Sequence, residues 1–161
     1  MKRNVVTVAL CAGAIALLAV AEARRGDVVL FNATPSVPTG FYVRAETPVR
    51  DGVFVTVRAA QVARSYASLR HFIGDGDRFI KRVGARSGVR VCAEGGTVTV
   101  GEIAYARQTH DSAGRTLPTW EGCRVLQDGE VFLMGETSDS FDSRYFGIVR
   151  EDVIEGVWKR L

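Results

Sequence analysis

Two residues of the sequence have the types needed for nucleophilic catalysis, a serine and a lysine. Ser36 stands between two prolines in the turn-forming stretch NATPSVPTGFY (residues 32–42). A serine hydroxyl is a weak nucleophile until a base removes its proton, and a lysine amine can be that base where an apolar environment lowers its pKa. Only three of the 21 basic residues are lysines, and Lys81 alone lies away from the termini. Compositional bias could also leave one lysine there, so both interpretations of Lys81 stay open at this point.

The residues around Lys81 favour the catalytic interpretation. It lies in the strand-like segment Arg78–Val83, where period-two alternation places its side chain on the same face as Phe79 and Val83. A lysine on such an apolar face is either strained and without function or desolvated and ready to accept a proton. Ser36 and Lys81 are therefore the pair on which a catalytic hypothesis rests.

The patterns of other hydrolases and of metal sites are missing from the sequence. It contains no Gly-x-Ser-x-Gly, His-Glu-x-x-His or Ser-x-x-Lys motif. His71 and His110 are the only histidines, and each is expected to be an ordinary residue. Without a Cys-x-x-Cys pair, a zinc site or a Cys/His catalytic pair has little support. We expect no metal and no cofactor.

Length and composition indicate one domain with a short appendage. The chain has 161 residues, of which 47% are hydrophobic and 24% are charged, enough to build a sizeable core. The formal net charge is only +3 and there is no long basic run. Nothing in this pattern suggests binding to nucleic acid.

The N-terminus has the pattern of a membrane anchor or a signal peptide. A positive cap precedes an uncharged, mostly apolar run from Val5 to Ala21, which as a helix would span roughly 25 Å. Ala21-Glu22-Ala23 also fits an A-x-A cleavage site. We expect residues 1–23 to be a membrane anchor or a signal segment, with the anchor preferred, and residues 24–161 to lie outside the cytoplasm.

A location outside the cytoplasm affects the expected oxidation state of the cysteines. Cys11 lies inside the apolar run, which leaves Cys92 and Cys123 as an even pair in an oxidising environment. This favours a disulfide over two free thiols.

The elements that must position Ser36 and Lys81 are mostly strands. Apolar and polar residues alternate in short segments separated by Gly-containing turns, which is typical of a mainly β fold with antiparallel sheets and one buried face. One short amphipathic helix is predicted between Ala59 and Ile73, and residues 107–122 form a long polar loop. The predicted strands are 27–31, 41–43, 53–57, 78–83, 88–92, 97–100 and 129–134.

Four motifs in order carry a family resemblance. They are Gly-Asp-Val-Val-x-Phe (26–31), Ser-Val-Pro-x-Gly-x-Tyr (36–42), Gly-Asp-x-x-x-Lys-Arg-Val (76–83) and Ser-Phe-Asp-Ser-Arg-Tyr-Phe-Gly (140–147). Together they resemble the membrane-bound serine peptidases of the signal peptidase I group. The last motif and Gly122-Cys123 place the likeness closest to the conjugal-transfer branch, the TraF type.

The resemblance implies a role for each matching residue. Ser36 would be the nucleophile and Lys81 the general base, with the Ser140 hydroxyl holding the lysine amine. Asp142 and Arg144 would form an ion pair that braces the segment. Thr34 would help the Ser36 N–H bind the oxyanion, which also makes physical sense because Pro35 has no N–H to donate.

The implied function is a membrane-associated Ser/Lys serine endopeptidase of the bacterial inner membrane, with its catalytic domain in the periplasm. Its substrate would be a pilin precursor or a related component of a conjugative or type IV secretion system, which it would cleave or cyclise. The alternatives are a general signal peptidase and a non-catalytic envelope scaffold. Two departures favour a specialised relative over a general one. Arg86-Ser87-Gly88 stands where the wider group has Pro-Gly-Asp, and Gly135-Glu136-Thr137 stands where it has Gly-Asp-Asn.

Overall fold

The computed structural model of the protein describes residues 27–161. The anchor or signal segment predicted for residues 1–23 lies outside this range. Within residues 27–161, no helix combines the length and apolar character needed to cross a membrane. The strands are β1 (Val29–Asn32), β2 (Gly40–Ala45), β3 (Phe54–Arg58), β4 (Arg78–Arg86), β5 (Arg90–Glu94), β6 (Thr97–Val100), β7 (Ile103–Ala106), β8 (Gly122–Val125), β9 (Glu130–Met134), β10 (Val149–Arg150) and β11 (Ile154–Arg160).

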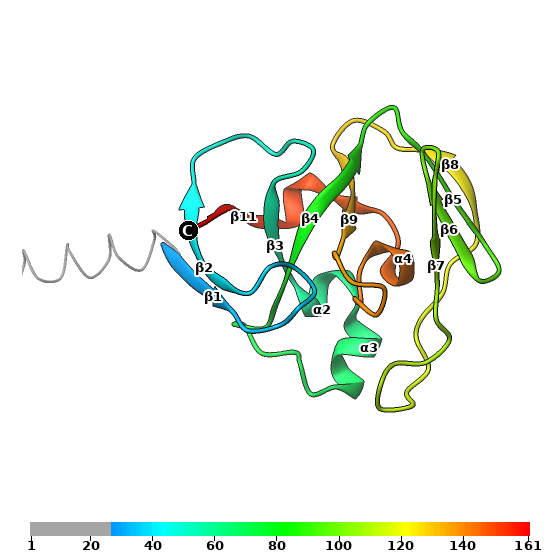
Figure 1. The fold of residues 1–161 in the computed structure, drawn as a ribbon, viewed down its shortest axis with the longest axis horizontal. Coiled ribbons are helices and arrows are strands. Elements are labelled where there is room, and N and C mark those ends of the chain that lie inside the picture. The colour runs from blue at the N-terminus through cyan, green and yellow to red at the C-terminus, as the bar shows by residue number, and fades with distance from the viewer. Residues whose placement is uncertain (1–26) are drawn as a thin grey trace, which may run out of the picture.

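The strands form two antiparallel sheets. The larger has the order β1-β2-β11-β3-β4-β9-β10, and the smaller has the order β7-β6-β5-β8. The smaller sheet lies at the end of the molecule away from β1 and β2 (Figure 1). The prediction of a mainly β, antiparallel fold is confirmed.

The central strands of the larger sheet are buried on both faces, so the prediction of a single buried face was wrong for them. On β4, Phe79 and Val83 pack into the main core, whereas Ile80 packs into a second cluster with Val37 and Trp158. One face is covered by the helices and by the segment that follows β9. The other is covered by the β1–β2 loop and, over β9, by the smaller sheet. A sequence pattern does not reveal that double cover, because it depends on contacts between distant segments.

The helical region also differs from the prediction. Instead of one helix between Ala59 and Ile73, two short helices form, α2 (Ala59–Val62) and α3 (Arg64–Leu69), because Ala63 leaves helical geometry with φ −149°. Among the apolar residues that recur at helical spacing in this segment, Tyr66 is buried, whereas Leu69 and Ile73 are exposed. A further helix, α4 (Ser143–Phe146), and the 3₁₀ turn η1 (Glu151–Val153) were not predicted.

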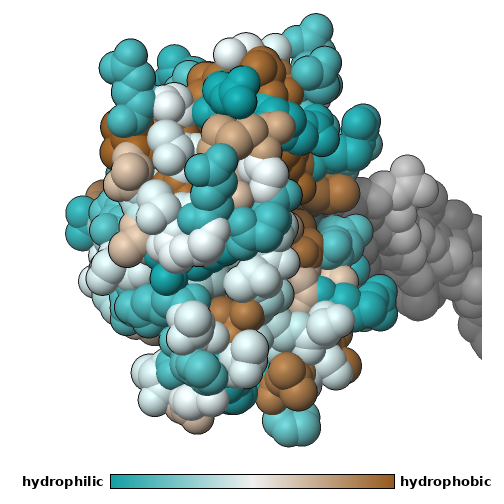
Figure 2. Space-filling view, turned by 90° about the vertical axis from the view of Figure 1, so that its right-hand side faces the viewer, coloured by the Kyte–Doolittle hydropathy of each residue, from teal (hydrophilic) through white to brown (hydrophobic). Residues whose placement is uncertain are grey.

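The smaller sheet carries the disulfide. Cys92 of β5 and Cys123 of β8 are directly opposed in the ladder, and their sulfurs are joined. The inner side of this sheet packs on Phe132 and Met134 of β9. Its outer face is mostly hydrophilic, with hydrophobic residues scattered among polar ones (Figure 2). The disulfide therefore links two strands of the solvent-exposed smaller sheet. It lies away from Ser36 and Lys81, which line a cavity elsewhere.

Candidate active site

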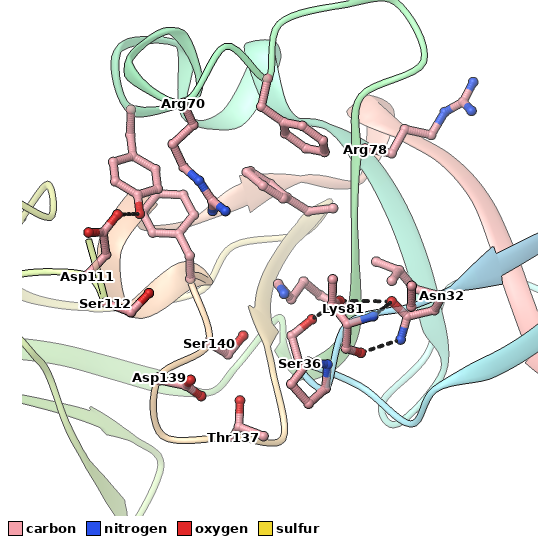
Figure 3. A pocket seen from close by; sticks show the side chains of 18 of the residues that line it. Asn32, Ser36, Arg70, Arg78, Lys81, Asp111, Ser112, Thr137, Asp139 and Ser140 are labelled. Carbon is pink, nitrogen blue, oxygen red and sulfur yellow. Dashed lines mark hydrogen bonds between the residues drawn. The ribbon is translucent and has the colours of Figure 1, made fainter. Parts of the chain in front are cut away.

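Four of the predicted site residues line one cavity of about 550 Å³: Ser36, Lys81, Thr34 and Ser140. They come from three separate segments, the β1–β2 loop, strand β4 and the loop after β9. Figure 3 shows the Lys81 side chain reaching past Ser36 into the cavity, where Ser140 lies on the facing loop. The fold thus brings together residues that are up to about a hundred positions apart in the chain.

Lys81 is buried, with 4% of its surface exposed, and it shares a face of β4 with Phe79 and Val83 as the alternation predicted. Within residues 27–161 its amine makes no ion pair and no hydrogen bond. Burial lowers the pKa of Lys81 from 10.5 to about 8, a shift that the charge of Asp142 opposes and that of Arg144 reinforces. A sizeable fraction of the amine is therefore neutral near pH 8 and able to accept a proton.

Ser36 lies half-buried in the turn of the β1–β2 loop. Its carbonyl accepts a hydrogen bond from the Glu136 N–H at 2.7 Å, which ties the serine to the loop after β9. Its Oγ lies 3.3 Å from Thr34 Oγ1. The loop is further held by the buried side chain of Val37 and by Tyr42, whose hydroxyl donates to the Pro38 carbonyl. The serine is thus anchored from several directions.

Asn32, which sequence reasoning left without a role, fills the inside of this loop. Its side-chain Nδ2 donates to the carbonyls of Thr34, Val37 and Pro38 at 2.8, 3.0 and 3.2 Å. Its Oδ1 accepts from the N–H and the hydroxyl of Thr34 at 3.1 and 2.9 Å. Asparagine bonds readily to nearby backbone in turns, so its place just before Thr-Pro-Ser is a signal that could have identified it.

These bonds fix the direction of the Thr34 hydroxyl. The three carbonyls accept only from Nδ2, so the amide orientation of Asn32 is unambiguous and its Oδ1 must accept the Thr34 proton. Ser36 is then the donor in its contact with Thr34. For Thr34 to donate to an oxyanion, as the resemblance implies, its proton would first have to leave Asn32.

Ser140 supplies a second hydroxyl beside Lys81. The residue is 4% exposed, and its Oγ is fully enclosed without a hydrogen-bond partner within residues 27–161. A buried hydroxyl without a partner costs about 1–3 kcal/mol. The neutral lysine amine toward which it points in Figure 3 is a suitable partner.

Asp142 and Arg144 form a buried pair behind the cavity. Their side chains are 0% and 3% exposed and meet in two contacts, Nε to Oδ1 at 2.8 Å and Nη2 to Oδ2 at 2.7 Å. Arg144 also donates to the carbonyls of Thr137, Ser138 and Ser140, and Asp142 accepts from the Gly135 N–H. The pair therefore shapes the loop that carries Ser140, and it acts on Lys81 through its charges.

Other residues considered from the sequence lie elsewhere. Neither His71 nor His110 lines the cavity, and the His110 ring is hydrogen-bonded to the neighbouring Thr109 hydroxyl. Across residues 27–161, no three His, Cys, Asp or Glu side chains are grouped in a way that could hold a metal ion.

Comparisons with known proteins identify the family of the chain. The chain matches the model of the family described as signal peptidase, peptidase S26, over residues 2–160. It is 35% identical over 159 residues to an Escherichia coli protein described as plasmid transfer protein TraF, covering 91% of this chain and 89% of that protein. A signal peptidase I from Enterococcus faecalis V583 superposes with a TM-score of 0.40 at 20% identity, over 70% of this chain and 98% of that one. The family match spans nearly the whole chain and confirms the resemblance seen in the four motifs. The protein belongs to the signal peptidase family of peptidases, S26, and is a relative of TraF.

Proposed function

We propose that the protein is a serine endopeptidase that uses Ser36 as nucleophile and Lys81 as general base. The observation that carries this proposal is the buried, unpaired amine of Lys81 in one cavity with Ser36 and with the unpaired hydroxyl of Ser140. A structural lysine would be expected to end in an ion pair or in solvent. An ion pair and solvent both favour the charged amine, so a lysine that must be neutral to act as a base is helped by the absence of both.

In this mechanism neutral Lys81 removes the Ser36 proton as the hydroxyl attacks a peptide carbonyl. The Ser36 N–H, together with Thr34 once its hydroxyl turns from Asn32, stabilises the oxyanion. The protonated amine, held by Ser140, then gives its proton to the leaving amine. Water or a second amine resolves the acyl-enzyme, which gives a hydrolysed or a cyclised product.

The proposed substrate is a pilin precursor or a related component of a conjugative system. This finer assignment is supported by the relative described as a plasmid transfer protein, which matches at 35% identity over nearly the full length. We further propose that residues 1–23 anchor the protein in the inner membrane and that residues 24–161 act in the periplasm. The disulfide between Cys92 and Cys123 supports an oxidising compartment.

The test is co-expression of the full chain with a pilin precursor, followed by the mass of the product. Wild type is expected to shorten the precursor, whereas Ser36→Ala and Lys81→Ala leave it intact. Ser138→Ala and Lys159→Ala are matched controls, because both side chains are exposed. A product lighter by one water than the linear form indicates cyclisation.

Three outcomes would contradict the proposal in different ways. Cleavage of many unrelated secretory precursors would favour a general signal peptidase. Undiminished conjugation by a Ser36→Ala strain would favour a non-catalytic scaffold. Full activity of Lys81→Ala would exclude the dyad.

A further inference from the structure

The cavity that holds Ser36 and Lys81 has a second, charged end. It is bordered by the C-terminal end of α3, where Arg70 follows the last helical residue, and by the loop that contains Asp111 and Arg115. Nothing in the mechanism above uses these residues.

Three arginines line the cavity, and two of them are neutralised. Arg78 pairs with Asp27 at 2.6 Å and with Glu155 at 2.5 Å, and in Figure 3 its guanidinium points away from the cavity. Arg115 pairs with Asp111 at 2.7 Å. The Arg70 side chain has no ion pair and no hydrogen bond to any residue of 27–161, and Figure 3 shows its guanidinium pointing into the cavity. Of these three arginines, Arg70 therefore presents an uncompensated charge to the space that a substrate would enter.

The guanidinium of Arg70 has a defined support. Its Cζ lies 5.6 Å from the centre of the Tyr66 ring, a cation–π contact. Tyr66 is itself fixed, because its hydroxyl donates to Asp111 at 2.7 Å and its ring stacks on Phe141 at 4.1 Å. Phe141 directly follows Ser140, so the ring that carries Arg70 is packed against the loop of the proposed dyad.

Arg70 is also close enough to act on the dyad. Its charge is among the causes that lower the pKa of Lys81. Asp139, the acidic residue on the opposite rim beside Ser140, makes no ion pair with Arg70. A carboxylate that entered the cavity would be attracted to the Arg70 guanidinium at one end and repelled by Asp139 at the other. This charge difference would orient the carboxylate toward Arg70.

We propose that Arg70 forms a carboxylate subsite of the substrate cavity, which binds an acidic side chain or a free C-terminal carboxylate of the peptide being cleaved. This inference rests on the proposed peptidase function. It extends that function to substrate choice, because a peptide with a carboxylate in this register would bind more tightly than its neutral counterpart.

The test uses synthetic peptides that span the cleavage junction of the co-expressed precursor, with purified full-length protein. Glu is placed in turn at each position on either side of the scissile bond, with Gln at the same position and an amidated C-terminus as reference. A separate pair compares a free C-terminal carboxylate with the amide. Rates are read from product mass, and kcat and KM are measured separately for each peptide.

We expect one Glu position, or the free C-terminus, to raise kcat/KM by about three- to tenfold, mainly through KM, because Arg70 is exposed and water screens part of the attraction. Arg70→Ala and Arg70→Gln are expected to bring the ratio of kcat/KM between the Glu and Gln peptides to about one. This ratio is taken within each variant, so an effect of Arg70 on Lys81 cancels from it. Arg64→Ala keeps the preference, since Arg64 begins the same helix and is exposed like Arg70 but does not line the cavity. Arg70→Glu is expected to prefer Lys at the same position.

The two proposals fail differently. If cleavage depends on Ser36 and Lys81 but no carboxylate is preferred, or if Arg70→Ala retains the preference, the subsite is refuted and the peptidase stands. If wild type cleaves none of the peptides nor the precursor, the proposed function fails and the subsite fails with it.

Discussion

The hydroxyl of Thr34 donates to Asn32 Oδ1 at 2.9 Å, and this bond sets the orientation of the loop that carries Ser36. Asn32 is 6% exposed and ends strand β1, where it is paired with Gly40 across the base of the loop. The Asn32 carboxamide supplies hydrogen bonds to the backbone of the loop, where a tighter turn would form hydrogen bonds between its own peptide groups. The position of Ser36 thus depends on a residue that does not react.

Replacing Asn32 by Ala is expected to reduce kcat by about 10²-fold, because a misplaced nucleophile loses alignment with the substrate carbonyl. The loss of the buried bonds should also lower the free energy of unfolding by about 1–3 kcal/mol. Both quantities can be measured on one preparation, by peptide cleavage and by urea unfolding. Tyr42→Phe, which removes one bond to the same loop at Pro38, should cost less in both. Equal kcat values for Asn32→Ala and wild type would show that the loop keeps its conformation without the Asn32 side chain.

Thr34 is expected to accelerate the attack of Ser36 on the substrate carbonyl without being essential for it. Losing one oxyanion donor typically costs about 10²–10³ in rate, so Thr34→Val should be slower by up to that factor, whereas Ser36→Ala should be inactive. Thr34→Ser keeps the hydroxyl and should retain most activity. Single-turnover cleavage of one peptide by the three variants checks the order. A Thr34→Val enzyme as fast as wild type would leave the Ser36 N–H as the sole donor from this loop.

The sequence predicted those parts of the fold that local patterns determine. Alternation identified β4 and correctly placed Lys81 on the face of Phe79 and Val83, because side-chain direction follows from strand geometry alone. It could not show that Ile80, one residue away, is also buried. The cover on that face comes from Val37 and Trp158, which are distant in the chain.

The same limit applied to the site. The motifs named Ser36, Lys81 and Ser140, and the fold places all three on one cavity. Asn32 and Arg70 were missed because their significance lies in what surrounds them: a ring of carbonyls in one case and missing acidic partners within residues 27–161 in the other. The place of Asn32 before Thr-Pro-Ser marks it as a turn residue, but its three carbonyl partners and, within the described residues, the missing acidic partner of Arg70 appear only when the loops are folded.

Gly135 lies against the proposed dyad so closely that any side chain would displace it. A Cβ at this position would be 1.9 Å from Ser140 Oγ and 3.0 Å from the Ser36 carbonyl oxygen. Gly135→Ala is therefore expected to cost about 1–3 kcal/mol in stability and to reduce activity by at least tenfold, since both residues must shift. Gly96→Ala, where a Cβ would meet nothing within 4 Å, is the matched control for unfolding and cleavage assays. Normal activity of Gly135→Ala would mean that Ser140 is free to move without consequence.

Activity should depend on pH through Lys81. Only the neutral amine accepts a proton, so kcat/KM should rise with pH around a midpoint near 8, the pKa that burial gives Lys81. Arg70→Ala removes a positive charge that lowers this pKa, so its midpoint should move to higher pH. The profile is measured with a neutral, amidated peptide, which isolates the base from any carboxylate preference. A midpoint below pH 6 would contradict the assignment of Lys81 as the base.

The lowered pKa of Lys81 should also make the stability of the protein depend on pH, independently of any substrate. In the unfolded chain the amine titrates near 10.5, and in the fold near 8, so between these values the unfolded state binds more protons. The free energy of unfolding therefore increases with pH across this window. Below about pH 8 the amine is charged in both states, and the cost of burying the charge is fully present. Lys81→Met removes that cost and should be more stable than wild type at pH 7, by on the order of 3 kcal/mol, with the difference shrinking toward pH 10. Urea unfolding of both proteins at several pH values measures it, and Lys159→Met, at an exposed site, should show no such trend. A difference between Lys81→Met and wild type that stays constant from pH 7 to pH 10 would mean that the amine keeps its ordinary pKa in the fold, and the case for a neutral base would be lost.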